Sequence, residues 1–403
     1  AYTGRVYVDK NKNGVFDPGE KTWAGIKVSD GLNVVETAAD GSFTLPGHER
    51  ERFIFITTPS GYKTFNRHYH KIEEKQSGYD FGLMPYSGRI RKDGSHKYIH
   101  IADTEIFNTE NHEDWVNNVR DYARNEQAAF IIHTGDICYE KGLKAHIKLM
   151  NTENMDCPVF YCIGNHDLVK GKYGEELFES IYGPVYYSFD AGNVHYIVTP
   201  MPGGDHAPGY TADDVCRWLK NDLAHIRPGT PVVVFNHDLL TYEDAFIFKS
   251  KNAGSINLNE HNLKAWVYGH WHINYMKKQG DVYSVCTSSL DKGGIDHSTT
   301  AFRVMHVDSK GDFTSELRYT YLDKNICIAS PAGVMASGVL PVAVNVYSSV
   351  SPVKEVLYTC LADGKPVLKN KRLLQSTDWS WNGELPLSDK HVGKELTLQV
   401  TAR

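Results

Sequence analysis

Five short apolar runs, each followed at once by carboxylate, amide or imidazole side chains, constrain the fold of this 403-residue chain more than any other feature. The clearest run covers residues 158–163 and leads through Gly164 into Asn165, His166 and Asp167. A run this short, bounded by proline and glycine, favours a strand buried on both faces over a helix. Polar groups that follow parallel strands gather at one edge of a sheet. The sequence therefore predicts an α/β fold with a site at that edge.

The other four runs end in side chains of the same kinds. They are residues 98–102 before Asp103-Thr104-Glu105, residues 129–133 before Thr134-Gly135-Asp136, residues 232–235 before Asn236-His237-Asp238, and residues 266–268 before Gly269-His270-Trp271-His272. A single histidine is more often a hydrogen-bonded structural residue than a ligand, but five such clusters at successive strand ends are hard to explain in that way. Histidine and carboxylate ligands without thiolate suit manganese, iron or zinc and do not choose among them.

These blocks resemble those of the calcineurin-like metallophosphoesterase family, which read D-x-H, G-D, G-N-H-D/E, H and G-H-x-H. The resemblance covers the middle of the chain in full and in order, and it implies a four-layer α/β/β/α core that hydrolyses phosphoesters with two metals. One position differs, because Glu105 stands where the family usually has histidine. We expect Glu105 to bind metal through an oxygen. The alternative is a first metal that binds weakly or is absent.

The resemblance also implies a role for each residue of the site. Asp136 bridges the two metals, Asp103 and His272 hold one of them together with Glu105, and Asn165, His237 and His270 hold the other. His166 lies outside the metal shell, contacts a phosphoryl oxygen and protonates the leaving group, while Asp167 or a neighbour orients it. The implied reaction is an in-line attack by a metal-bridging hydroxide without a phosphoenzyme. Asn165, His166 and Lys292 are the expected substrate-binding residues.

Two glycine-rich loops, residues 199–206 and 288–294, occupy positions where substrate contacts are expected. Lys292 is expected to meet a phosphate there, and His206 or His297 to line the cleft. The alternative is that these are ordinary residues of surface loops.

Residues 1–86 have the pattern of a β-domain, with strands expected at 4–8, 26–28 and 53–56 and a hairpin turn at Asp40-Gly41. Residues 9–20 match the 12-residue calcium loop. Its expected ligands are Asp9, Asn11, Asn13, the Val15 carbonyl, Asp17 and Glu20. Only three of them are carboxylates, which indicates weak affinity of about 10⁻⁴ to 10⁻³ M, as in extracellular modules. The alternative is a polar turn rich in asparagine and glycine.

Three domains are expected: an N-terminal β-sandwich over residues 1–86, the catalytic domain over 97–322 and a C-terminal β-sandwich over 323–403. The middle domain is expected to hold helices over 113–125 and 212–226 and a hairpin around 191–193. Its last strands, 282–285, 301–307 and 313–321, alternate like antiparallel edge strands.

The amino-acid composition limits the classes of partner and the cellular location that can be expected. The 43 basic and 49 acidic residues leave a net charge of −6, which gives no electrostatic reason to expect nucleic acid. No apolar run approaches the length that spans a bilayer. The seven scattered cysteines contain no C-x-x-C pair and predict neither a disulfide framework nor a thiolate zinc site. A signal peptide is not among the 403 residues, and we expect a periplasmic, cell-surface or secreted location.

The function expected from these features is a phosphatase that acts on a small or envelope-derived phosphoester. A phosphodiesterase or a nucleotide pyrophosphohydrolase uses the same metals and is the alternative within the enzymes. A non-enzymatic surface scaffold with a degenerate metal site is the alternative outside them, and Glu105 is its only support. The oligomeric state is left open.

Overall fold

The computed structural model describes residues 1–64, 67–322, 324–334 and 338–403. These residues form two compact units, Ala1–Thr320 and Tyr321–Arg403. The N-terminal strands and the α/β core lie together in the first unit, so their division into separate domains stays a prediction. Asp323, where the third domain was expected to begin, lies outside the described residues.

The first unit begins with two four-stranded sheets that share one apolar core. Their strand orders are β4-β1-β8-β6 (Ser42–Leu45, Tyr2–Val8, Phe81–Pro85, Tyr62–Thr64) and β3-β2-β5-β7 (Val34–Glu36, Lys27–Ser29, Phe53–Ile56, Tyr69–Lys71). Asp40-Gly41 forms a turn, but the predicted hairpin was wrong, because β4 pairs with β1 while β3 pairs with β2. Because β3 and β4 belong to different sheets, the chain crosses from one sheet to the other at this turn. Phe43 and Leu45 of β4 are buried beside Val6 of β1 in the shared core.

Two larger sheets form the α/β core. The five-stranded sheet has the order β11-β10-β9-β20-β21 (Val159–Tyr161, Phe130–His133, His96–Ile101, Ala301–Val307, Phe313–Tyr319). The six-stranded sheet has the order β12-β13-β14-β17-β19-β18 (Tyr187–Ala191, Val194–Val198, Val232–Phe235, Leu263–Tyr268, Val282–Cys286, Tyr275–Gln279). Strands β9 to β11 run parallel, as do β13, β14, β17 and β19. Each sheet therefore brings several strand ends to one edge.

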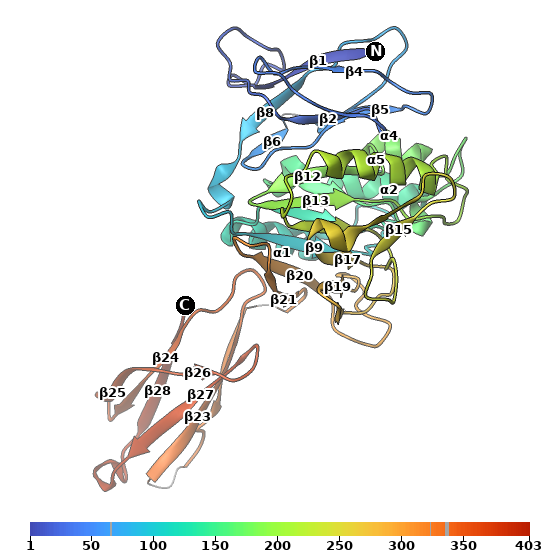
Figure 1. The fold of residues 1–403 in the computed structure, drawn as a ribbon. Helices are drawn as coiled ribbons and strands as arrows, with labels where there is room; N and C mark the ends of the chain where they lie inside the picture. The colour runs from blue at the N-terminus through green and yellow to red at the C-terminus, as the bar shows by residue number, and fades with distance from the viewer. Residues whose placement is uncertain (65–66, 323, 335–337) are drawn as a thin grey trace. The chain divides into compact units, whose positions relative to one another are not determined.

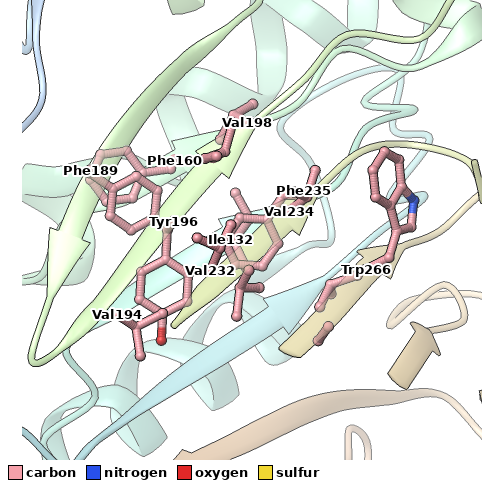
Figure 2. Close-up of a cluster of buried hydrophobic side chains, with 14 of the residues drawn as sticks. Ile132, Phe160, Phe189, Val194, Tyr196, Val198, Val232, Val234, Phe235 and Trp266 are labelled. Carbon is pink, nitrogen blue, oxygen red and sulfur yellow. The ribbon is translucent and has the colours of Figure 1, made fainter. Parts of the chain in front are cut away.

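One hydrophobic cluster contains side chains from both large sheets. Figure 2 shows Ile132 and Phe160 of the five-stranded sheet together with Tyr196, Val234 and Trp266 of the six-stranded sheet. Because side chains alternate along a strand, the neighbouring residues of β9 and β10 belong to a second cluster with the helices α1 (Glu113–Asn125), α2 (Tyr139–Leu149) and α4 (Glu176–Tyr182). Helix α5 (Ala212–Ala224) adds Trp218 and Leu219 to the first cluster. The predicted mixed α/β core is confirmed, and the order of its four layers stays a prediction.

The predicted helices and hairpin are confirmed, with one boundary shifted. Helix α1 has the predicted bounds, whereas α5 ends at Ala224 and begins after Thr211, whose hydroxyl accepts a hydrogen bond from the Asp214 amide. Strands β20 and β21 are antiparallel as predicted. Residues 282–285 belong to β19, which pairs antiparallel with β18, as predicted, but pairs in parallel with β17 on its other side. The strand is therefore not an edge strand, and Val282 and Val285 are buried. Smaller elements complete the unit: α3 (Thr152–Met155), β15 (Ile247–Lys249), β16 (Ser255–Asn257) and the 3-10 turns Ser87–Arg89, Asn165–Asp167 and Leu258–His261.

The second unit contains two further sheets with their own core. Their orders are β22-β23-β27-β26 (Asn325–Ser330, Gly338–Tyr347, Ser380–Leu387, Leu374–Gln375) and β25-β24-β28 (Lys365–Arg372, Val356–Ala362, Leu396–Ala402), with a 3-10 turn at Asp389–His391. Val344, Leu373 and Trp381 are buried in this core. Figure 1 labels the elements along the chain. All seven cysteines are free thiols. Within the described ranges, every helix is too short or too polar to cross a membrane.

Candidate metal centre

The loops after β9, β10, β14 and β17 bring six predicted ligands into two groups. Asp136, His237 and His270 form one group, and Asp103, Glu105 and His272 form the other, with the ligand atoms of each group within 4.8 Å of one another. Glu105 and Asp136 also approach each other beside Cys138, so the two groups adjoin. Burial raises the pKa of the Cys138 thiol, which keeps it protonated and makes it a poor ligand.

The distances between ligand atoms suit cations. His237 Nε2 lies 3.2 Å from Asp136 Oδ2 and 3.8 Å from Asp103 Oδ1. His272 Nε2 lies 3.3 Å from both Asp103 Oδ1 and Glu105 Oε1. Ligands on metal bonds of about 2.1 Å in a tetrahedral site are separated by roughly 3.4 Å. Asp103 Oδ1 therefore lies near one histidine from each of the two ligand groups.

Three buried polar atoms at this place have no hydrogen-bond partner among the described residues. They are Asp103 Oδ1, Asn165 Oδ1 and His237 Nε2. Leaving such an atom unpaired in the interior costs about 1–3 kcal/mol. Because two of the three carry lone pairs only and the third is an imidazole nitrogen, the donor set fits one or two metal ions.

Hydrogen bonds fix which atoms remain free to bind. The carbonyl of Thr134 accepts a hydrogen bond from His237 Nδ1 at 2.8 Å, which leaves the Nε2 lone pair for a metal. The backbone amide of His270 donates to Asp103 Oδ2 at 2.9 Å, which leaves Oδ1 free. The surrounding backbone thus orients both side chains toward the same place.

The electrostatics of the metal-free site also favour a cation. Burial raises the pKa of Asp103, although His272 and His237 oppose this. Burial by itself would lower the pKa of His237, but the Asp136 and Asp103 carboxylates outweigh it and raise that pKa to about 9. The carboxylates of Asp103 and Glu105, each with an oxygen 3.3 Å from His272 Nε2, raise the pKa of His272 to about 10. Protons therefore supply the positive charge in the metal-free protein, and a metal has to displace them.

The backbone at the strand ends is strained in a way that places the ligands. Asp103, Glu105, Asp136, His270 and His272 have φ values of 52°, 47°, 57°, 66° and 53°. Residues other than glycine rarely adopt this left-handed region, and strain of this kind concentrates at functional sites. Five of the seven predicted metal ligands share it, so the tight turns and not the strands themselves aim these side chains.

His166 lies beside the ligand groups and has an acidic partner that sequence reasoning missed. Its Nδ1 is 2.8 Å from Asp205 Oδ2, in the loop after β13. The Tyr139 ring, 45% exposed, packs 5.1 Å from the imidazole. Burial opposes a charge on His166, but the carboxylates of Asp205 and Asp136 raise its pKa. The only signal for Asp205 is an acid inside a glycine-rich loop.

Asp167, which was expected to orient His166, is hydrogen-bonded to backbone amides instead. Its buried carboxylate accepts hydrogen bonds from the backbone amides of Asp136 (2.9 Å), Cys138 (2.9 Å) and Gly164 (2.8 Å). Asp205, not Asp167, contacts the His166 ring. The structure therefore replaces the expected role of Asp167 with one of joining the turns after β10 and β11.

The remaining predicted residues lie at the edge of the centre. Lys292 Nζ donates to the Glu105 carbonyl at 2.7 Å and lies 3.4 Å from Glu105 Oε2. His206 and His297 are exposed on their loops. Substrate binding by Lys292 stays a prediction.

The predicted calcium loop is closed by its own hydrogen bonds. Asp17 Oδ2 accepts from the side-chain amides of Asn11 (2.9 Å) and Asn13 (2.6 Å), and Asp9 accepts from the Gly14 amide at 2.7 Å. Glu20 accepts from the amides of Lys10 and Asp17. Calcium binding at residues 9–20, with the Val15 carbonyl as a further ligand, stays a prediction.

The parallel strands of the two large sheets bring Asp, Glu and His side chains together at their carboxyl ends. This arrangement defines the class of α/β proteins that bind metal ions at strand ends. Family models agree with this class. The model described as "N terminal of Calcineurin-like phosphoesterase" matches residues 10–86, and the model "Calcineurin-like phosphoesterase" matches residues 96–274. The chain belongs to the calcineurin-like phosphoesterase family.

Solved structures share parts of the fold at low identity. An archaeal phosphodiesterase is 13% identical over 55% of this chain and 99% of its own, with a TM-score of 0.27. Plasmodium GAP50, described as the anchor in the inner membrane complex, is 15% identical over 56% and 88%, with a TM-score of 0.35. Mycobacterium tuberculosis phosphopantetheinyl hydrolase is 14% identical over 49% and 91%, with a TM-score of 0.32. No curated protein matches the chain. The family assignment therefore depends on the family models.

Proposed function

We propose that this protein is a dinuclear-metal-dependent phosphoester hydrolase, and specifically a phosphatase for a small or envelope-derived phosphoester. The observation that carries the proposal is the pair of adjoining ligand groups with Asp103 Oδ1, Asn165 Oδ1 and His237 Nε2 buried and unpaired among the described residues. A histidine with an acidic partner stands beside them.

Each residue of the centre has a distinct task in this proposal. Asp103, Glu105 and His272 would hold one metal, Asn165, His237 and His270 would hold the other, and Asp136, which is near residues of both groups, would serve both. Two bound cations would neutralise the phosphoryl oxygens and lower the pKa of a bound water. Asp205 accepts the Nδ1 proton of His166, so the opposite nitrogen of the imidazolium can donate a proton to the leaving oxygen.

Magnitudes show why the ligand groups matter more than the acid. Hydrolysis of phosphate monoesters requires accelerations of up to ~10²¹, and a positioned acid supplies about 10² to 10⁴ of that. Most of the rate enhancement must therefore come from charge stabilisation at the metal centre. Removing the metals is expected to abolish activity.

Hydrolysis of para-nitrophenyl phosphate and of bis(para-nitrophenyl) phosphate tests the proposal, with manganese, zinc and chelator arms. Chelator-sensitive hydrolysis of the monoester is the expected result. Preference for the diester would instead favour a phosphodiesterase or nucleotide pyrophosphohydrolase. The absence of chelator-sensitive hydrolysis of either ester would favour the non-enzymatic scaffold.

Calcium binding and an extracytoplasmic location form a separate part of the proposal. A calcium loop with three carboxylates, Asp9, Asp17 and Glu20, is expected to fill only where calcium is plentiful. Millimolar calcium should raise the melting temperature of the full chain, and Asp9→Asn should remove that rise. An unchanged melting temperature in the wild-type protein would exclude the calcium site.

A further inference from the structure

We propose that Arg50 is a positioning residue that holds the loop carrying Asp205, and through it His166, in place for proton transfer. Arg50 belongs to the N-terminal module, defined here as residues 1–86, to which the mechanism assigns no part. The catalytic side of this proposal rests on the proposed function. Its structural side, the anchoring of the loop, does not.

The loop from Asp205 to Gly209 is attached to the core at three points. The Asp205 amide donates to the Asn165 carbonyl at 3.0 Å, and the Gly174 amide donates to the Ala207 carbonyl at 2.8 Å. The Gly209 amide donates to the buried Glu175 carboxylate at 2.7 Å. The geometry of the His166 to Asp205 hydrogen bond therefore depends on where this short loop is held.

Arg50 provides a fourth attachment, from outside the core. Its Nη2 donates to the Gly209 carbonyl at 2.6 Å, and its Nε and Nη2 donate to the two oxygens of Asp214 at 2.8 and 2.7 Å. Asp214 lies in the first turn of α5. This bidentate, charge-assisted pair is geometrically specific, and it fixes the end of the loop to the start of the helix.

Arg52 of the same module lies near Gly209 through two acidic residues. Its Nη2 lies 2.8 Å from Glu179 Oε1 and 3.8 Å from Glu175 Oε2, and Glu175 accepts the Gly209 amide. A Cβ atom at Gly209 would lie 2.9 Å from both Arg52 Nη1 and Glu175 Oε1, so a larger residue there would displace these two side chains. Arg50 thus contacts the Gly209 carbonyl directly, while Arg52 lies beside the carboxylate that accepts from the Gly209 amide.

The N-terminal module packs against the α/β core and can therefore support the loop that carries Asp205. Phe55 of β5 packs against Trp218 of α5 with ring centroids 6.2 Å apart, and both belong to the hydrophobic cluster shared by the two large sheets. Tyr186 donates a hydrogen bond to the Gly31 carbonyl at 2.9 Å. Strand β5 and helix α5 therefore hold Arg50 at a fixed distance from the loop.

The loop needs such support because of its composition. Gly203, Gly204 and Gly209 lie within seven residues, and glycine leaves the backbone with more freedom than any other residue. A displacement of about 1 Å at a catalytic group can cost about 10²-fold in rate. Loss of Arg50 is therefore expected to disorder the Asp205 contact without changing the metal ligands.

Hydrogen exchange tests the anchoring without any assay of activity. Arg50→Ala in the full chain should raise the exchange of peptides that cover residues 203–210. Lys21→Ala is the matched control, because Lys21 is an exposed cation of the same module that donates to Tyr62 within that module. Unchanged exchange in Arg50→Ala would overturn the proposal. Arg50→Gln replaces Arg50→Ala if the alanine variant does not fold, since it keeps part of the side chain but cannot make the bidentate pair.

Kinetics test the link to His166. Arg50→Ala should lower kcat on an alkyl phosphate by about tenfold or more, with KM and metal content unchanged. The loss on para-nitrophenyl phosphate should be smaller, because its leaving group needs no proton. In an Asp205→Asn background the same change should add no further loss. Equal losses on both esters, or additive losses in that background, would overturn the positioning role. If the wild-type protein hydrolyses neither ester, the proposed function fails while the exchange result still decides the anchoring.

Discussion

Glu105 supplies the second carboxylate of the ligand group that it forms with Asp103 and His272. Its carboxylate lies 3.3 Å from His272 Nε2 and 3.4 Å from Lys292 Nζ. Burial by itself would raise the pKa of Glu105, but His272 and Lys292 outweigh it and lower that pKa. Glu105 is therefore ionised at neutral pH and can serve as an oxygen ligand where most of the family has histidine.

Substitution of Glu105 tests whether its side chain binds a metal ion. Glu105→Ala should weaken binding of one of the two metals by about tenfold or more, in the range found when the surroundings of a metal are altered. Glu105→His should retain both metals. Metal content after dialysis against a weak chelator measures this. Two metals retained by Glu105→Ala would exclude Glu105 from the ligand set.

His166 gives the second prediction at this scale. Removing a positioned acid costs about 10² to 10⁴ in rate, so His166→Asn should lower kcat by that amount on an ester with a poor leaving group. The loss on para-nitrophenyl phosphate should be smaller. Metal content serves as the control, because the His166 side chain is outside the ligand groups. Full turnover on the poor leaving group would remove the proposed role.

The residues that gather in the two ligand groups could be predicted from the sequence, and the partner of His166 could not. Asp103, Asp136 and His237 each follow a short apolar strand, so one local rule finds them. The parallel pairing of β9 with β10 brings Asp103 and Asp136 together, and the packing of the two sheets brings His237 to them. Asp205 lies 39 positions from His166 in a loop without periodicity. The contact between Asp205 and His166 depends on how that loop folds back, and the spacing of residues in the sequence does not predict this.

At the scale of elements, a buried ion network joins two strands, one helix and the N-terminal module. His195 of β13 lies 2.6 Å from Asp190 Oδ1 of β12 and 2.6 Å from Asp222 Oδ2 of α5. Ser188 donates to Asp222 at 2.8 Å, and Thr57 of the module lies 2.8 Å from Ser188. The network needs a positive His195, because two carboxylates face it.

This network predicts how stability changes with pH. Burial would lower the pKa of His195, but Asp222 and Asp190 raise it to about 9, compared with about 6.5 in the unfolded chain. Because the folded pKa is raised, the stabilisation is fully present below about pH 6.5 and is lost as the pH rises through about 9. The expected loss is about 3 kcal/mol.

Urea unfolding at several pH values between 6 and 10 measures this loss. His195→Asn is the comparison, since it removes the titrating group while other groups still titrate in both proteins. The difference in unfolding free energy between the two should shrink by about 3 kcal/mol over that range. A constant difference would show that His195 carries no extra proton in the folded state.

Element types could be predicted better than element partners. Helix α1 has its predicted bounds, because Trp115, Val119 and Tyr122 repeat at helical spacing on its buried face. The expected hairpin partner of β4 and the expected edge position of β19 were wrong, because pairing depends on which sheet buries a strand and not on the strand's own pattern. Alternation along 282–285 is compatible with either direction of pairing.

At the scale of the whole molecule, the chemistry and the C-terminal unit are separate. Both ligand groups and the His166 to Asp205 pair lie within Ala1–Thr320. The unit Tyr321–Arg403 has a core of its own, in which Leu373 is fully buried. Two cores of this kind are expected to melt as two cooperative transitions.

Calorimetry of the full chain with one substitution in each core tests this independence. Leu373→Ala removes a buried side chain from the second unit and should destabilise that unit by about 2–5 kcal/mol. Only one transition should shift, and hydrolysis should remain at the wild-type level, since every described ligand lies in the other unit. Ile131→Ala, in the cluster between the five-stranded sheet and its helices, should shift the other transition by a similar amount. If either substitution moved both transitions together, or if Leu373→Ala lowered activity, the two units would be coupled, and the C-terminal unit would have to be included in any account of catalysis.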